Sequence, residues 1–161
     1  FPHGVLFRKE EKAMREQMVK SDLIECVIGL GPNLFFNSPM EACIIICRTR
    51  KEPAREKSIL FINAIKEVTR KNAESYLEEE HIRKIVHAYN KAENISSFCK
   101  LASCKEIENK NYDLTISRYV HPEDNLNVDT DSIDSATCIK IWQDAHRTTN
   151  ESIEGLIALL K

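Results

Sequence analysis

The sequence lacks the residue clusters from which enzyme active sites are usually built. Only four glycines occur among 161 residues, and none belongs to a glycine-rich phosphate or cofactor loop. No serine, histidine and aspartate set has a suggestive spacing, and the five histidines are dispersed. The chain therefore contains no recognisable catalytic centre, and we expect each histidine to be a surface or packing residue.

A basic surface and a membrane segment are also missing. The formal net charge is -2, so any contact with nucleic acid has to come from a local patch or from a partner subunit. The longest apolar runs, such as 42–47, are far too short to cross a bilayer, and no segment resembles a signal peptide. We therefore expect a cytoplasmic protein without membrane contact.

The six cysteines do not form a metal-binding pattern. Cys43 and Cys47 are four residues apart, but no histidine or second cysteine pair is near enough in sequence to complete a tetrahedral zinc site. Three cysteines lie in apolar runs, where a free cysteine behaves as a small hydrophobic residue. These features predict a reduced protein without a metal site.

The composition is that of an ordinary folded domain. Apolar residues make up 42% of the chain and charged residues 30%. The first residue is Phe1 rather than Met, and the segment 1–7 already has the pattern of a buried strand end followed by a turn. We therefore expect the chain to be part of a longer protein.

Alternating apolar patterns indicate an α/β fold. Strands are predicted at 1–7, 23–30, 41–48 and 58–64, with a helix at 8–20. The run 41–48 is nearly all apolar, as expected for a strand that is covered on both faces. Five basic residues and Pro53 between 48 and 57 predict an antiparallel hairpin that joins 41–48 to 58–64. We interpret these charges as a solvated hairpin tip, with a phosphate contact as the alternative.

Helical and extended segments follow. Ser75-x-x-Glu78 has the pattern of a capping box that opens a helix with an apolar face at Ile82, Ile85, Val86 and Tyr89. Ser103-x-x-Glu106 opens a shorter helix. Alternating residues then predict an extended, strand-like segment over 112–120, and the polar residues 121–131 predict a linker.

Residues 132–161 predict one long helix with a heptad seam. If it is continuous, it is on the order of 40 Å long, which favours packing against a partner over folding back on its own domain. Gly155 and the run 148–150 weaken it. The apolar seam residues are Ile139, Trp142, Ile153, Leu156 and Leu160.

Several stretches of the first 120 residues follow one another in a recognisable order and spacing. They are PHGVLFR at 2–8, GLGPNLFF at 29–36, ACIII at 42–46, LFINA at 60–64, and the spaced apolar and aromatic residues of 82–89 and 106–120. In this order and spacing they resemble the modification (M) subunit of type I restriction enzymes, a family of N6-adenine DNA methyltransferases.

This resemblance implies the carboxy-terminal part of a Rossmann-like methyltransferase sheet, followed by a helical tail. Residues 1–70 then supply the closing strands and helix, 71–120 a helical and extended extension, 121–131 a linker, and 132–161 the long helix for subunit packing. Family members bind S-adenosylmethionine at an amino-terminal Gly-containing loop, and an Asn-Pro-Pro-Phe/Tyr motif holds the flipped adenine. Both motifs are expected upstream of Phe1, so the chain has no catalytic or cofactor-binding residue and is expected to be inactive alone.

The resemblance also implies a target-base pocket wall at Asn33, Phe35 and Phe36. A planar side chain beside an extruded base restores about 1 to 3 kcal/mol of stacking. The alternative is that both aromatics plug the core. The family loop usually begins Leu-Pro-Pro-Asn and continues Tyr-Gly-Thr-Gly-Ile-Pro, whereas this chain has Gly31 and lacks the Gly-Thr pair.

The implied partners are DNA, the specificity (S) subunit and the restriction (R) subunit. In this family the S subunit reads the DNA target, and the carboxy-terminal helices of M pack against the spacer helices of S. Trp142 is the expected anchor of that contact. The alternative function is a non-catalytic remnant or interaction module that binds the S subunit through its terminal helix.

Overall fold

The protein is described from a computed structural model, which covers residues 1–35, 38–71, 74–121, 139, 142–143 and 147. The chain divides into two compact units, Phe1–Glu123 and Asp124–Lys161. Within the described residues, no helix has the length and apolar character needed to span a membrane. The described residues of the second unit are all helical and exposed: Ile139, Trp142, Gln143 and Arg147.

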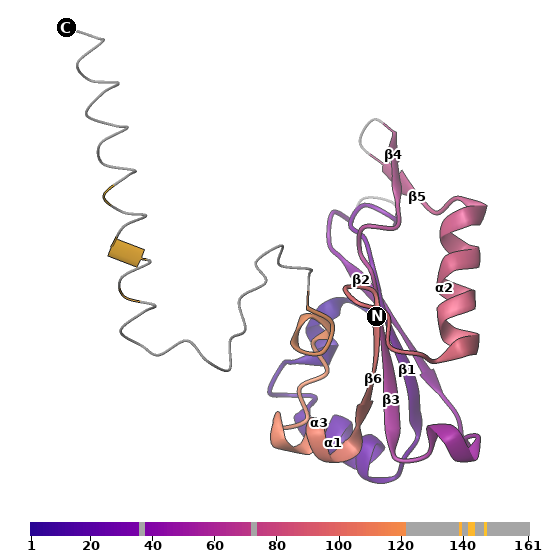
Figure 1. Cartoon of the computed structure of the whole chain (residues 1–161), viewed down its shortest axis with the longest axis vertical. Helices are drawn as coiled ribbons and strands as arrows, with labels where there is room; N and C mark the ends of the chain where they lie inside the picture. Colours follow the sequence, from indigo (N-terminus) through magenta and orange to yellow (C-terminus); the bar gives the residue numbers. More distant parts are fainter. Residues whose placement is uncertain (36–37, 72–73, 122–138, 140–141, 144–146, 148–161) are drawn as a thin grey trace, which may run out of the picture. The chain divides into compact units, whose positions relative to one another are not determined.

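The first unit is built on a four-stranded mixed sheet with the order β2-β1-β3-β6 (Figure 1). The central strands β1 and β3 pair in parallel, while β2 pairs antiparallel with β1 and β6 antiparallel with β3. Both central strands are rich in branched apolar residues, which suits strands buried on both faces. The bounds are β1 Ile24–Leu30, β2 Ala42–Cys47, β3 Ser58–Ala64 and β6 Cys99–Ser103.

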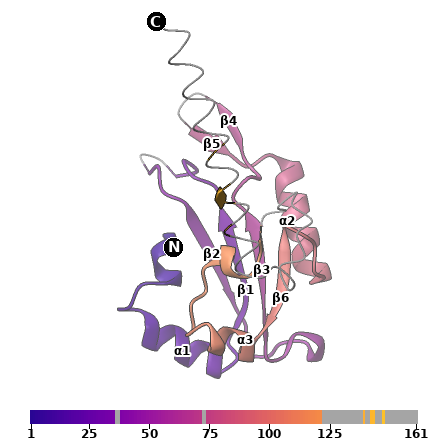
Figure 2. The same cartoon turned by 60° about the vertical axis from the view of Figure 1, so that its left-hand side comes forward.

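Helices cover both faces of this sheet (Figures 1 and 2). The helix α2 (Glu79–Lys91) covers one face, and α1 (Lys12–Lys20) and α3 (Cys104–Asn109) cover the other together with two short 3₁₀ helices, η1 (His3–Leu6) and η3 (Ile116–Arg118). Each face has its own apolar core, as in other layered α/β domains. The predicted α/β class is confirmed.

The segment between β2 and β3 is not the predicted hairpin. The strand β3 lies on the opposite side of β1 from β2, so residues 48–57 cross the end of the sheet and include the 3₁₀ helix η2 (Pro53–Arg55). The basic side chains of this segment are not a solvated tip either, because several of them pair with buried or half-buried carboxylates. The prediction is wrong because a local pattern indicates a strand but does not fix which neighbour it pairs with.

Two predicted strands have a different form. The segment 1–7 makes one isolated bridge, from Pro2 to Ala42, and then turns into η1. The strand β2 lies at the edge of the described sheet, and Ile44 is 46% exposed, so this strand is not covered on both faces. A continuous apolar run therefore does not separate a central strand from an edge strand.

The segment 112–120 is buried but is not a strand. It folds into an irregular turn and η3, and Tyr119 stacks on Phe61 with ring centroids 3.9 Å apart. The alternation of Leu114 and Ile116 with polar residues therefore predicts burial correctly and the backbone conformation incorrectly. Packing against β3 replaces the sheet hydrogen bonds that the pattern implied.

The start of α2 also differs from the prediction. Its capping box is formed by Glu78 and His81, with the Glu78 amide donating to His81 Nδ1 at 3.2 Å. Ser75 instead lies in a small hairpin of β4 (Thr69–Lys71) and β5 (Glu74–Tyr76), which the sequence does not predict. The cap of α3 is confirmed, since Ser103 Oγ accepts from the Glu106 amide at 3.2 Å.

Candidate functional site

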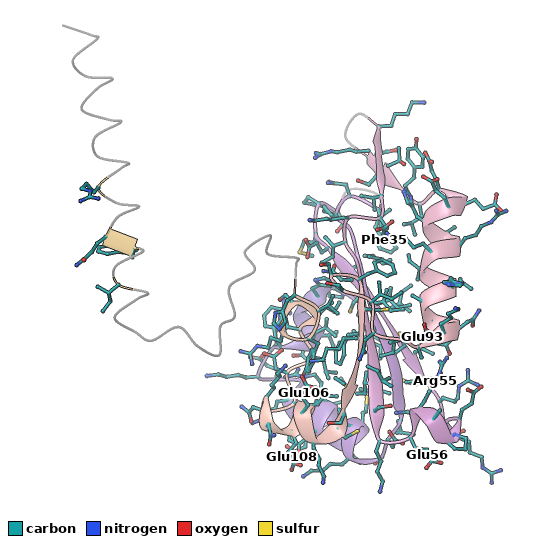
Figure 3. The ribbon with its side chains drawn as sticks, viewed as in Figure 1. Phe35, Arg55, Glu56, Glu93, Glu106 and Glu108 are labelled. Atoms are coloured by element: carbon teal, nitrogen blue, oxygen red, sulfur yellow. The ribbon has the colours of Figure 1, made fainter. Side chains whose placement is uncertain are left out.

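The candidate site lies where β1 and β3 end. The two strands run in parallel, so the loop 31–41 after β1 and the segment 65–78 after β3 leave from the same edge of the sheet. In open α/β sheets, ligands bind outside the carboxyl ends of the strands. Figure 3 shows Phe35 at this end of the sheet and Arg55 at the opposite end.

Gly31 brings the loop into close contact with the segment after β3. A Cβ atom added to Gly31 would lie 2.6 Å from the carbonyl oxygen of Ile65 and 2.8 Å from a methyl carbon of Val68. Such distances are shorter than van der Waals contact, so only glycine fits here without a shift of the neighbouring backbone. The lack of a side chain at Gly31 therefore allows this close packing.

Asn33 joins the loop to the small hairpin. Its backbone has a positive φ of 60°, a left-handed conformation that asparagine tolerates better than most residues. Its carbonyl oxygen accepts a hydrogen bond from the Ser75 amide at 2.9 Å. The loop therefore lies along the outer edge of β5.

Phe35 points away from the core. Its neighbour Leu34 packs against the apolar core on the α2 side, whereas Phe35 is 56% exposed. The Ser38 amide donates to the Phe35 carbonyl at 3.0 Å and closes a tight turn. Phe35 is therefore not a core plug, while Phe36 lies outside the described residues.

His3 holds the far end of the loop, a role that sequence reasoning missed. His3 Nδ1 lies 3.1 Å from a carboxylate oxygen of Glu41, and the His3 amide donates to the Glu41 carbonyl at 3.4 Å. His3 Nε2 is buried without a hydrogen-bond partner among the described residues. It faces Gly29, where an added Cβ atom would lie 3.5 Å from it. No spacing rule links positions so far apart in sequence, so nothing in the sequence signals this contact.

The glycines at the end of β1 do not form a cradle for S-adenosylmethionine. A Cβ atom at Gly29 lies 2.5 Å from Ile116 Cδ1, and the space beside Gly31 is filled by Ile65 and Val68. Protein atoms therefore occupy the volume that a cofactor loop leaves open.

The described residues also offer no metal cluster, and four of their thiols are poorly reactive. No group of three or more His, Cys, Asp or Glu side chains is placed to hold a metal ion in this part of the chain. The five described cysteines are free, and burial raises the pKa of the Cys26, Cys43, Cys99 and Cys104 thiols. A raised pKa keeps a thiol protonated and therefore poorly nucleophilic.

An ionic network lies at the opposite end of the sheet. The buried Glu25 carboxylate accepts from Arg48 Nε at 2.8 Å and from the Tyr89 hydroxyl at 2.7 Å, and Arg55 lies 3.5 Å away. Arg55 also donates to the Tyr89 and Asn90 carbonyls at 2.7 and 2.8 Å, at the end of α2. Burial raises the pKa of the Glu25 carboxyl, but the hydrogen bonds from Arg48 and Tyr89 outweigh it and leave the pKa below its ordinary value.

Only part of the predicted subunit seam is described. Ile139 and Trp142 are helical, and their exposed fractions are 56% and 65%. Ile153, Leu156 and Leu160 lie outside the described residues. The seam therefore stays a prediction.

Comparison with known proteins identifies similar chains. A family model described as N-6 DNA Methylase matches residues 1–127. The type I restriction enzyme MjaVIII methylase subunit of Methanocaldococcus jannaschii is 34% identical over 94% of this chain, and the MjaVII methylase subunit of the same organism is 32% identical over 98%. These alignments cover 26% and 27% of the two relatives, so the chain spans about a quarter of their length.

A solved structure is similar as well. The type I restriction-modification system methyltransferase subunit from Streptococcus thermophilus superposes with a TM-score of 0.69 and 38% sequence identity. The match covers 74% of this chain and 25% of that subunit. The sheet and its flanking helices therefore have a counterpart in a protein of similar sequence.

Proposed function

The chain belongs to the N-6 DNA methylase family, and from this membership we propose that it is the carboxy-terminal part of a type I restriction-modification methyltransferase subunit. The complete protein transfers a methyl group from S-adenosylmethionine to N6 of adenine in DNA. The match of the family model over residues 1–127 carries this proposal. We further propose that the cofactor site and the catalytic residues belong to the rest of the complete protein, and we expect this fragment alone to be inactive; the filled space beside Gly29 and Gly31 supports this proposal.

A methylation assay tests this function directly. The complete protein, assembled with its specificity subunit, is incubated with genomic DNA and S-adenosylmethionine, and nucleosides are then measured by mass spectrometry. N6-methyladenine is the expected product. DNA that gains 5-methylcytosine, or no methyl group, contradicts the proposal.

We further propose that Asn33, Phe35 and Phe36 line the pocket for the flipped adenine. Phe35 is exposed at the carboxyl end of β1, and the loop is held by Ser75 at one end and by His3 at the other. A loop held at both ends loses little conformational entropy when a base stacks on it. Base stacking on an aromatic ring contributes about 1 to 3 kcal/mol.

Replacing the two aromatics tests this pocket. In the complete protein, Phe35→Ala with Phe36→Ala is expected to slow methylation, because the extruded base loses its stacking partner. The expected rise in the activation free energy is about 1 to 3 kcal/mol. Binding of S-adenosylmethionine, measured by calorimetry, is expected to stay unchanged. Phe7→Ala is the matched control, since Phe7 is 54% exposed but lies outside the loop. Equal methylation by both variants would remove the two aromatics from the site.

The partners are proposed from the terminal segment. We propose that residues 132–161 pack against the specificity subunit through Ile139, Trp142, Ile153, Leu156 and Leu160, and that the restriction subunit joins this complex. Trp142 is the expected anchor, because buried tryptophans dominate many interfaces. Trp142→Ala with Leu156→Ala should abolish co-purification with the specificity subunit, whereas Gln143→Ala, next to the seam, should not. Unchanged co-purification of the double variant would show that the seam is wrongly assigned.

A further inference from the structure

The β4–β5 hairpin presents two basic side chains beside the loop 31–41, in which the pocket for the flipped adenine is proposed. Arg70 and Lys71 lie on β4, next to the turn of the hairpin, and both are exposed. Strand alternation places them on opposite faces, so the hairpin carries one cation on each side. Tyr76 on β5 adds an aromatic ring that is 41% exposed. Basic and aromatic side chains on one small element are typical of nucleic-acid contacts.

The hairpin is joined to the loop by two independent contacts. The Ser75 amide donates to the Asn33 carbonyl at 2.9 Å, so β5 lies beside the loop. Gly31 packs against Ile65 and Val68 in the segment that leads into β4. A ligand that binds to the loop 31–41 therefore lies beside the hairpin.

The two cations of this hairpin differ from Arg48, Lys51 and Arg55 at the other end of the sheet, which are paired with carboxylates. Among the described residues, no ion pair involves Arg70 or Lys71, although Glu74 lies opposite Lys71 in the strand register. The nearby Glu67 is paired with Lys84. By contrast, Arg48 and Lys51 are already paired with carboxylates. Within the part of the chain that the structure describes, the two hairpin cations thus have no carboxylate partner to give up on binding an anion.

We propose that the β4–β5 hairpin binds the DNA backbone beside the extruded adenine, with Arg70 and Lys71 contacting phosphates of the strand that carries it. This inference rests on the proposed function. Phosphate contacts fix the position of a protein on the duplex and carry no sequence information. The hairpin therefore positions the loop over the target base while recognition of the sequence stays elsewhere.

Salt dependence of DNA binding tests the proposal. The complete methyltransferase complex is titrated against a short fluorescein-labelled DNA duplex that it methylates, at several salt concentrations. The plot of log affinity against log salt has a negative slope, and each lost phosphate contact lowers the magnitude of that slope by about 1. Arg70→Gln with Lys71→Gln is therefore expected to lower the magnitude of the slope by about 2 and to retain methylation at saturating DNA.

A matched control removes the same charge elsewhere. Lys91→Gln with Lys105→Gln changes two exposed lysines near the opposite end of the first unit, at the end of α2 and on α3 (Figure 1). This control should keep the slope of the unmodified complex. An unchanged slope in the hairpin variant of an active enzyme, or an equal drop in the control, would overturn the proposal. A complex that transfers no methyl group even before substitution would overturn the proposed function, and this inference with it.

Discussion

The two ends of the sheet use their basic residues differently. At the end where β1 begins, Arg48 and Arg55 are paired with the buried Glu25. At the end where β1 and β3 finish, Arg70 and Lys71 are exposed and absent from the ion pairs of the described residues. Arg48 and Arg55 are therefore committed to a carboxylate at one end, whereas no printed pair commits Arg70 and Lys71 at the other end within the part of the chain that the structure describes.

The difference follows from what each end has to hold together. The network around Glu25 joins β1, the crossing segment 48–57 and the end of α2, which are far apart in sequence. A buried carboxylate is tolerated only when it is paired and hydrogen-bonded, so its partners are committed to the fold. Among residues 1–35, 38–71 and 74–121, no buried acid of this kind pairs with Arg70 or Lys71, and we expect these cations to be available to an external anion.

The largest effect is expected from breaking the network. Glu25→Gln leaves two arginines without their carboxylate, and loss of one partner of a buried ion pair costs several kcal/mol. Because Arg48 is half exposed and can regain water, we expect a loss of about 3 kcal/mol in the free energy of unfolding, measured in urea on the complete protein. The exposed Glu93→Gln is the control (Figure 3). A loss no larger than that of the control would mean that this end is not held by charge.

A smaller effect is expected at the other end, from Gly31→Ala. The added Cβ meets the Ile65 backbone carbonyl, which cannot rotate away, so we expect a loss of about 1 to 2 kcal/mol in the free energy of unfolding. Methylation is expected to fall as well, because the loop and hairpin shift apart. In the control Gly4→Ala, the new Cβ meets only the flexible Arg8 side chain. Equal stability and activity in both variants would show that the loop is not fixed by this contact.

The same contrast explains how far the sequence predicts the fold. The strands 23–30, 41–48 and 58–64 and the helix 8–20 are correctly located, because each carries a long apolar or amphipathic pattern. The pairing of β3 with β1 is missed, since pairing depends on contacts between distant segments. The strands β4, β5 and β6 are missed because they are short and mostly polar or mixed in pattern.

The candidate site is predicted only where a family motif marks it. The loop with Asn33 and Phe35 is found through resemblance, and the structure adds that Phe35 is exposed. The contacts that hold this loop come from His3 and Ser75, which lie far away in sequence, and neither the resemblance at 2–8 nor the capping-box pattern at 75–78 signals these contacts. The sequence also does not place Arg70 and Lys71 near the loop, because their position depends on the contact between β5 and the loop.

The smallest expected effect is the response of the Glu25 network to acid. The pKa of this carboxyl lies below its ordinary value of 4.5, since the hydrogen bonds from Arg48 and Tyr89 outweigh the effect of burial. A lowered pKa in the folded state contributes stability above the ordinary value, and that stability is lost as the pH falls through the folded pKa. Unfolding in urea should therefore become easier below about pH 4.5, and less steeply so in Glu25→Gln.

The Glu106 carboxyl also has a lowered pKa, because its hydrogen bonds to Lys110 and Lys100 outweigh burial, so the Glu25→Gln variant keeps part of the acid response. Arg70→Gln with Lys71→Gln removes cations and should follow the unmodified protein throughout this range. Equal acid responses in all three proteins would contradict the division of charge between the two ends.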